Sequence, residues 1–209
     1  MKVRSSAILG AMADNNVRRA LFLTVFAVGL TFFGAAGASA QGFVSPFIGY
    51  DFGGDSSCPQ VTGCEDKRLN LGLGLGVMNN VVGFEEEFAY AKDFFGTAPQ
   101  LSSSVLTVMS NLMIVPNVGP VRPYVTGGLG LIKTHVDLNS PGTVFSSDNN
   151  NFGWNVGGGV MVLFNGRIGV RGDIRYFHSF QNFDVGPIVS ISGEKLDFGR
   201  ASVGFVARF

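Results

Sequence analysis

Apolar and polar residues alternate with a period of two along much of the chain after residue 40. From Leu69 to Val77 every second residue is aliphatic, and the positions between hold Asn70 and the glycines at 72, 74 and 76. Successive side chains of a β-strand point to opposite faces, so this period predicts a strand with one wholly apolar face. No stretch of ten or more residues beyond residue 40 repeats its apolar residues at helical spacing. The pattern therefore predicts an all-β domain.

Eight alternating segments follow one another, separated by residues that favour turns. Asn79-Asn80 and Asn165-Gly166 occupy two of the shortest gaps, and Asn-Gly between alternating segments is a strong hairpin signal. Hairpins join neighbouring strands in antiparallel order, so the segments predict an up-and-down sheet. The predicted strands cover residues 43–52, 68–77, 81–91, 104–115, 122–134, 152–164, 167–177 and 196–209.

The predicted connections alternate between long and short. Polar stretches at 53–67, 93–103, 135–151 and 178–195 are long, whereas those at 79–80, 116–121 and 165–166 are short. This asymmetry is typical of a transmembrane β-barrel with short periplasmic turns and long external loops. The interior of an eight-stranded barrel is narrow, so glycines would face inward and leucines would face lipid. A soluble sandwich or lipocalin-type barrel has the same alternation with its apolar face inside, and glycine opposite leucine argues against it.

The first 40 residues are typical of an export signal. Arg18 and Arg19 precede the apolar run ALFLTVFAVGLTFFGAAG, and ASA at 38–40 fits a signal-peptidase site before Gln41. We expect a signal peptide at 1–40, beginning at Met1 or Met12, and a barrel domain at 41–209. An uncleaved membrane anchor is the alternative, because the run approaches the length that spans a bilayer. Export also predicts a disulfide between Cys58 and Cys64.

Composition and motifs exclude several functions. The formal net charge is zero, so no basic surface indicates nucleic-acid binding. GLGLGV has a period of two instead of the spacing G-x-G-x-x-G, and GGLGLIKT has Ile132 where a phosphate-binding loop needs glycine. No histidine near the two cysteines completes a zinc site. We therefore expect no cofactor and no metal.

Charged residues on the inward face predict a network inside the barrel. Glu85 and Glu87 on the third predicted strand would face residues of the seventh, because charges enclosed in a narrow lumen must pair or stay hydrated. The predicted lumen charge network consists of Arg68, Glu85, Glu87, Arg122, Arg171, Asp173, Arg175 and Arg200. Such a network would plug the barrel and fix its register. The alternative is a charged constriction that conducts ions or small solutes.

Glu86 falls on the lipid side of its strand. We expect a β-bulge that turns this carboxylate inward, with a protein or lipid contact as the alternative. The serine-rich and asparagine-rich segment at 146–151 and the loop of Cys58 and Cys64 are candidate surfaces for a ligand, host matrix or phage, or are solvated connectors.

Two histidines give a weak indication of hydrolysis. His178 is followed by Ser179 with Asp184 nearby, and His135 precedes Asp137. Adjacent strand residues point to opposite faces, which favours solvated positions over a catalytic set.

The segments VGFEEEFAYA, GPVRPYVTGGLGLIK, FGWNVGGGV, GRIGVRGDIRYF and FGRASVGFVARF together resemble the outer-membrane β-barrel family, with its OmpA/OmpX-like eight-stranded barrels. The resemblance implies an eight-stranded antiparallel transmembrane barrel in the bacterial outer membrane, in contact with its lipid and lipopolysaccharide. It also implies that the barrel-assembly machinery reads the C-terminal segment through Ser202, Gly204, Phe205 and Phe209, although Ala207 departs from that pattern. The implied role is structural or surface-interacting, without catalysis. A narrow passive pore and a lipid A-modifying hydrolase are the alternatives.

Overall fold

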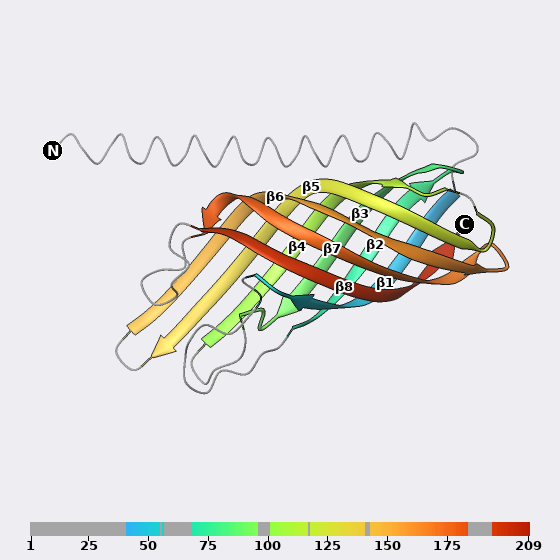
Figure 1. Cartoon of the computed structure of the whole chain (residues 1–209). Helices are drawn as coiled ribbons and strands as arrows, with labels where there is room; N and C mark the ends of the chain where they lie inside the picture. The colour runs from blue at the N-terminus through green and yellow to red at the C-terminus, as the bar shows by residue number, and fades with distance from the viewer. Residues whose placement is uncertain are drawn as a thin grey trace.

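Eight antiparallel strands close into one barrel, in which each strand pairs with its neighbours in the chain and β8 pairs with β1 (Figure 1). The computed structural model describes residues 41–54, 56, 68–95, 101–116, 118–140, 143–183 and 194–209. The predicted all-β, up-and-down, eight-stranded barrel is confirmed. Among the described residues, no helix is long and apolar enough to cross a membrane. The strands are β1 (Gln41–Phe52), β2 (Leu69–Met78), β3 (Val82–Lys92), β4 (Leu101–Ile114), β5 (Val121–Ser140), β6 (Thr143–Phe164), β7 (Ile168–Phe183) and β8 (Glu194–Arg208).

A row of directly paired residues, followed from strand to strand around the barrel, does not return to the residue at which it began but to one further along the same strand. One row begins at Gly42 and returns to the same strand at Phe52, so the shear of the barrel is ten residues. A barrel of eight strands with strongly tilted strands has an interior just wide enough for side chains. The row consists of Gly42, Val77, Phe84, Leu112, Gly127, Val156, Tyr176, Gly199 and Phe52.

Apolar side chains cover the outside, and the arginines and most of the acids of the strands' middle parts are enclosed. On β2, Leu71 is 67% exposed, whereas its neighbour Asn70 is 2% exposed. Arg175 and Arg200, which are 1% exposed, lie inside. A soluble barrel has the opposite arrangement, because water requires its charged side chains outside and its apolar ones within. The observed arrangement is that of a barrel whose outer face contacts lipid.

The glycines of β2 make room for larger side chains of the neighbouring strands. A Cβ atom at Gly72 would lie 2.1 Å from the ring of Phe47, and one at Gly74 would lie 2.4 Å from a carboxylate oxygen of Glu85. At Gly76 it would lie 2.5 Å from the ring of Phe43. The wall of leucines therefore faces outward because the other face of β2 is filled by side chains from β1 and β3.

The connection between β5 and β6 differs from the prediction. Residues 135–151, predicted as a long polar loop, belong almost entirely to the two strands, which pair continuously from Val121 and Val162 to Ser140 and Thr143. This hairpin projects past the other strands at the end opposite the C-terminus (Figure 1). The prediction relied on apolar outward residues. Outside the lipid an outward residue need not be apolar, so the alternation stops there although the strands continue. We call this end of the barrel the long-loop end, and the end with the turns after β2, β4 and β6 the short-turn end.

Candidate functional site

Seven charged side chains meet inside the middle of the barrel, and we call them the central ionic layer. Each of them is at most 7% exposed. Because burial deprives a charge of most of its hydration, each of them depends on partners supplied by the protein. The central ionic layer consists of Asp51, Glu85, Glu87, Arg171, Asp173, Arg175 and Arg200.

Glu85 binds two arginines of β7 across the lumen. Arg171 donates hydrogen bonds to both carboxylate oxygens of Glu85, and the Nη2–Oε2 distance is 3.1 Å. Arg175 donates to the same oxygen at 2.9 Å and lies 2.7 Å from Glu87. Charge-assisted bonds with two-pronged geometry are the strongest kind between side chains. The contacts tie β3 to the strand on the opposite wall and fix their relative height.

Asp173 is held between the two arginines that flank it on β7. Its oxygens lie 3.0 Å from Arg171 Nε and 3.2 Å from Arg175 Nε. Tyr124 donates its hydroxyl proton to Asp173 at 2.5 Å, and Ser202 donates at 3.0 Å. Asp173 therefore has partners on three strands, β5, β7 and β8.

Arg200 completes the layer toward the long-loop end. Its Nε donates to Asp51 at 2.7 Å and its Nη1 donates to Thr107 at 3.1 Å, while Glu87 lies 3.8 Å away. The layer thus holds three guanidinium groups and four carboxylates, which is close to neutrality.

The structure brings six of the eight predicted network residues together and places the other two elsewhere. Arg122 is the second residue of β5 and lies at the short-turn end, whereas Arg68 immediately precedes β2 at the opposite end. The backbone carbonyl of Arg68 accepts a hydrogen bond from the backbone of Asp51. Asp51 itself was not predicted, although its place between Tyr50 and Phe52 marks an inward position. The role of Tyr124 in binding Asp173 was not predicted either.

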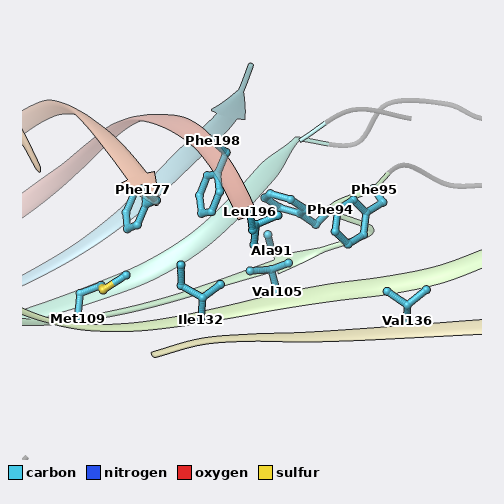
Figure 2. Packing of buried hydrophobic residues seen from close by; sticks show 10 residues of the cluster. All are labelled: Ala91, Phe94, Phe95, Val105, Met109, Ile132, Val136, Phe177, Leu196 and Phe198. Carbon is cyan, nitrogen blue, oxygen red and sulfur yellow. The ribbon is translucent and has the colours of Figure 1, made fainter. Parts of the chain in front are cut away.

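An apolar layer lies next to the central ionic layer on the side of the long-loop end. Figure 2 shows how its side chains pack. Phe177 and Phe198 stack with their ring centroids 4.8 Å apart, and Phe94 meets Phe198 edge-on at 5.0 Å. Asp93 has a positive φ of 57°, which turns the chain after β3 so that Phe94 and Phe95 enter the barrel. This long-loop apolar layer consists of Ala91, Phe94, Phe95, Val105, Met109, Ile132, Val136, Phe177, Leu196 and Phe198.

A second apolar layer lies on the other side, toward the short turns. Its residues are at most 4% exposed. Two arginines of the central ionic layer contact aromatic rings of the apolar layers. The Arg171 guanidinium lies 4.9 Å from the ring centre of Tyr124 in this layer, and that of Arg200 lies 4.8 Å from the ring centre of Phe177 in the long-loop layer. This short-turn apolar layer consists of Phe43, Met78, Met113, Val115, Tyr124, Met161, Leu163 and Val206.

Sequence reasoning missed both apolar layers. Two of the six methionines precede residue 41, and the other four, Met78, Met109, Met113 and Met161, all point into the lumen. Unbranched methionine fits irregular gaps in a packed interior. The available signal was β4, where inward Met109 and Met113 interleave with outward Val108 and Leu112, so that both faces are apolar.

Glu86 is not turned inward by a bulge, and that prediction is wrong. Pairing is continuous from Val82 to Lys92 on the β4 side and through Glu86 on the β2 side. The carboxylate stays on the outer face, where Ser110 Oγ donates to it at 2.8 and 2.9 Å. The hydroxyl of a serine on the neighbouring strand, and not a turn into the lumen, gives this carboxylate a hydrogen-bond partner.

The histidine positions fall on the outer surface near the long-loop end. His178 Nδ1 contacts Asp197, and its ring lies 5.5 Å from that of Trp154. Ser179 is fully buried on the inner face, so the two adjacent side chains point apart. His135 lies on β5 and is half-buried, and Asp184 lies outside the described residues. In the part of the chain that the structure describes, no three potential metal ligands are grouped.

Three predicted features remain predictions. Residues 1–40, Cys58 and Cys64 lie outside the described residues. At the C-terminus, Phe205 and Phe209 are exposed at 67% and 82%, and Gly204 faces inward against Phe47. Recognition of these residues by the assembly machinery is not tested by the fold. The whole segment 146–151 lies in β6 instead of a loop.

Comparisons with known proteins agree with this architecture. A family model described as the outer membrane protein beta-barrel domain matches residues 25–209. The crystal structure of Neisserial surface protein A is similar with a TM-score of 0.55 and 15% identity, over 82% of this chain and 98% of that one. A major outer membrane protein from Thermus thermophilus gives a TM-score of 0.56 and 11% identity, over 82% and 100%. At such identities the likeness concerns the fold. No functionally curated protein matches the sequence.

Proposed function

The chain belongs to the outer membrane protein β-barrel family, and from this premise we propose that it is a closed, non-catalytic barrel with a structural and surface-contacting role. Membership places it in the bacterial outer membrane. The long-loop end then faces the outside of the cell and the short turns face the periplasm. The lumen holds the barrel together, and the projecting β5–β6 hairpin is the part available to partners.

The order of the layers inside the lumen is the observation that supports a closed barrel, because an apolar layer lies on each side of the central ionic layer. An ion entering from either end must first pass buried phenylalanine and methionine side chains, which offer it no replacement for its hydration shell. Apolar constrictions of this kind block conduction by excluding water. Beyond them, an ion would meet Arg171 and Arg175, both already bound to Glu85. The charges therefore act as a lock between strands, and a passive pore is the less favoured alternative.

Flux measurements test closure directly. The protein is reconstituted into phospholipid vesicles, and release of potassium chloride and of a neutral disaccharide is compared with that of empty vesicles, with a general porin as the positive control. We expect release at the rate of empty vesicles. Release well above that rate by the folded protein would establish the passive pore and overturn the closed lumen.

The β5–β6 hairpin supports the surface-contacting role. Its strands extend to Ser140 and Thr143, nine residues beyond the outward pair Leu131 and Phe152, so the hairpin rises above the membrane surface. The test compares cells that display the natural barrel with cells whose hairpin is shortened by joining Thr134 to Asn149 through Asn-Gly. Adherence is measured on surfaces coated with collagen, laminin or fibronectin. We expect the shortened form to lose adherence to at least one coat. Equal adherence of both forms, or none above cells lacking the protein, would overturn this role.

The position of Ser179 supports the absence of catalysis. A hydrolase needs its nucleophile within hydrogen-bond reach of the base, yet Ser179 lies inside the barrel while His178 lies outside. Mass spectrometry of lipid A from cells with and without the protein provides the measurement. We expect identical acyl patterns, and a lost or added acyl chain would show that the barrel is an enzyme.

A further inference from the structure

Three arginines gather at the short-turn end of the barrel, outside the central ionic layer. Arg122 on β5 is paired with Met161. Arg208 on β8 is paired with Phe43. Directly paired residues lie on the same face of a sheet, and both of these partners are buried in the lumen, so Arg122 and Arg208 are on the inward face as well. Arg167 lies beside Arg208, whose backbone N–H donates to its carbonyl at 2.7 Å. We call Arg122, Arg167 and Arg208 the short-turn arginines.

No acidic side chain balances these arginines at their own end of the barrel. No aspartate or glutamate occurs in the short turns or in the two strand residues on either side of each turn. The C-terminal carboxylate, next to Arg208, is the anion that the described chain supplies there, so at least two positive charges stay uncompensated. The central ionic layer differs, because Arg171, Arg175 and Arg200 each lie within ion-pair distance of a carboxylate.

Some N–H groups of the short-turn arginines have no acceptor. The Nε–H groups of Arg122 and Arg208 are buried and unpartnered within the part of the chain that the structure describes. The Nη atoms of Arg208 donate to the carbonyl of Gly166, at 3.3 Å, and to the side chain of Gln41, and both of these acceptors are neutral. Arg122 is also close enough to Arg208 for the two like charges to repel each other. An anion placed between them would accept the free N–H groups and remove the repulsion.

We propose that the short-turn arginines bind a phosphate group that carries two negative charges and enters the mouth of the barrel from the water. A planar guanidinium offers paired N–H donors that match phosphate oxygens, which makes arginine well suited to phosphate recognition. The charge also matches, because a phosphate monoester carries about −1.5 to −2 charges at pH 7. An opening lined by charges of one sign concentrates ions of the other sign.

The phosphate group stops at the mouth of the barrel. Met161 and Phe43, the pairing partners of Arg122 and Arg208, belong to the short-turn apolar layer, and apolar side chains do not replace the hydration of an anion. The arginines are on the inward face, away from the surrounding lipid, which favours a water-soluble phosphate compound over a lipid headgroup. The inference rests on the proposed function for its direction alone, because the short turns then face the periplasm and the phosphate comes from there.

Calorimetric titration of the purified protein tests this site. The natural protein is extracted from outer membranes into micelles of a neutral detergent and titrated with inorganic phosphate slightly above neutral pH, at constant ionic strength. Acetate serves as the monoanion, and phosphatidic acid mixed into the micelles serves as a lipid-borne phosphate. The variant R122Q/R208Q removes two charges at the mouth, and its matched control K92Q/K133Q removes two exposed charges on the side of the long-loop end. The heat-dependent shift in gel mobility confirms that each variant is folded.

We expect saturable binding of inorganic phosphate, with a dissociation constant at least tenfold lower than that of acetate. The constant should rise at least tenfold in R122Q/R208Q and change less than threefold in K92Q/K133Q. Equal effects of the two double variants would overturn the proposal, because binding would then follow net charge alone. Absence of saturable phosphate binding by the natural protein, or binding of phosphatidic acid without binding of inorganic phosphate, would overturn it as well. None of these outcomes depends on flux through the lumen, so a failure of this site is distinguishable from a failure of the closed barrel.

Discussion

Replacing Arg175 by methionine removes the cation that the central ionic layer uses most. Its guanidinium lies 2.9 Å from Glu85, 2.7 Å from Glu87 and 3.2 Å from Asp173. Methionine is shorter than arginine but keeps an unbranched apolar stem, so the change removes the charged guanidinium and retains the packing of the stem. Three buried carboxylates lose a partner in one step.

The size of the effect follows from what each carboxylate keeps. Glu85 retains Arg171, and Asp173 retains Arg171 with two hydroxyl donors. Among the described residues, the one cation that Glu87 retains is Arg200, at 3.8 Å. Removing one partner of a buried ion pair typically destabilises a protein by about 3–5 kcal/mol, because the remaining charge stays buried without compensation. We therefore expect R175M to lower the free energy of unfolding by about 3–5 kcal/mol, most of it through Glu87.

Equilibrium unfolding in urea, with the barrel inserted in phospholipid vesicles, measures this change. The chain has one tryptophan, Trp154, on the outer face, so its fluorescence reports the transfer of the barrel out of lipid. The double variant R175M/E87Q removes the orphaned charge and should recover at least about 1 kcal/mol of the loss, a coupling that a double-mutant cycle isolates. Two results would refute this account of the layer. One is a loss of less than about 1 kcal/mol in the free energy of unfolding of R175M, and the other is strictly additive effects of the two substitutions.

Three further substitutions have expected effects in the same urea assay. G74V places side-chain atoms in the space of the Glu85 carboxylate, because a Cβ atom at residue 74 would lie 2.4 Å from one of its oxygens, and overpacking should destabilise the barrel by about 1–3 kcal/mol; natural stability would show that the lumen has spare room. F177A removes the ring that stacks on Phe198 and supports Arg200, and the cavity should cost about 3–5 kcal/mol, whereas a loss below about 1 kcal/mol would mean that the long-loop apolar layer is loosely packed. E86L should stabilise the barrel by about 1–2 kcal/mol because a carboxylate leaves the lipid face; destabilisation would show that the hydrogen bond from Ser110 contributes more to stability than the carboxylate costs.

The barrel could be predicted from the sequence because lipid acts on one face of every strand. Between Leu69 and Val77 the outward residues are all aliphatic, and the same requirement recurs on the other seven strands. Short turns such as Asn165-Gly166 mark the ends of the strands on one side, where both residues have positive φ as a tight hairpin turn requires. On the other side nothing forces the outward residues to be apolar. The strands β5 and β6 consequently continued past the point at which the pattern could be recognised.

The interior was predictable only where inward residues were charged. Glu85, Glu87 and the arginines of β7 stand out because each lies next to an apolar outward residue along its strand. Inward Met109 and Phe198 do not stand out, since apolar residues on both faces erase the period of two. Both apolar layers therefore escaped the prediction, although their residues are as thoroughly buried as the ions between them.

Charge balance was the physical constraint that the prediction of the lumen did not use. The eight predicted network residues hold five arginines and three acids, an excess of positive charge that a water-free interior would not tolerate without further acids. Near-neutrality requires that some of the arginines lie at the ends of the barrel or that further inward acids join the layer. The structure shows both, because Arg68 and Arg122 lie at opposite ends, which leaves three arginines and three acids, and Asp51 joins the layer by binding Arg200. The charges inside an enclosed lumen must nearly balance, so whether a given charged residue lies in the layer depends on the signs of the other charges there. In a barrel that encloses its polar face, the sum of the inward charges is thus as informative as the alternation that places them there.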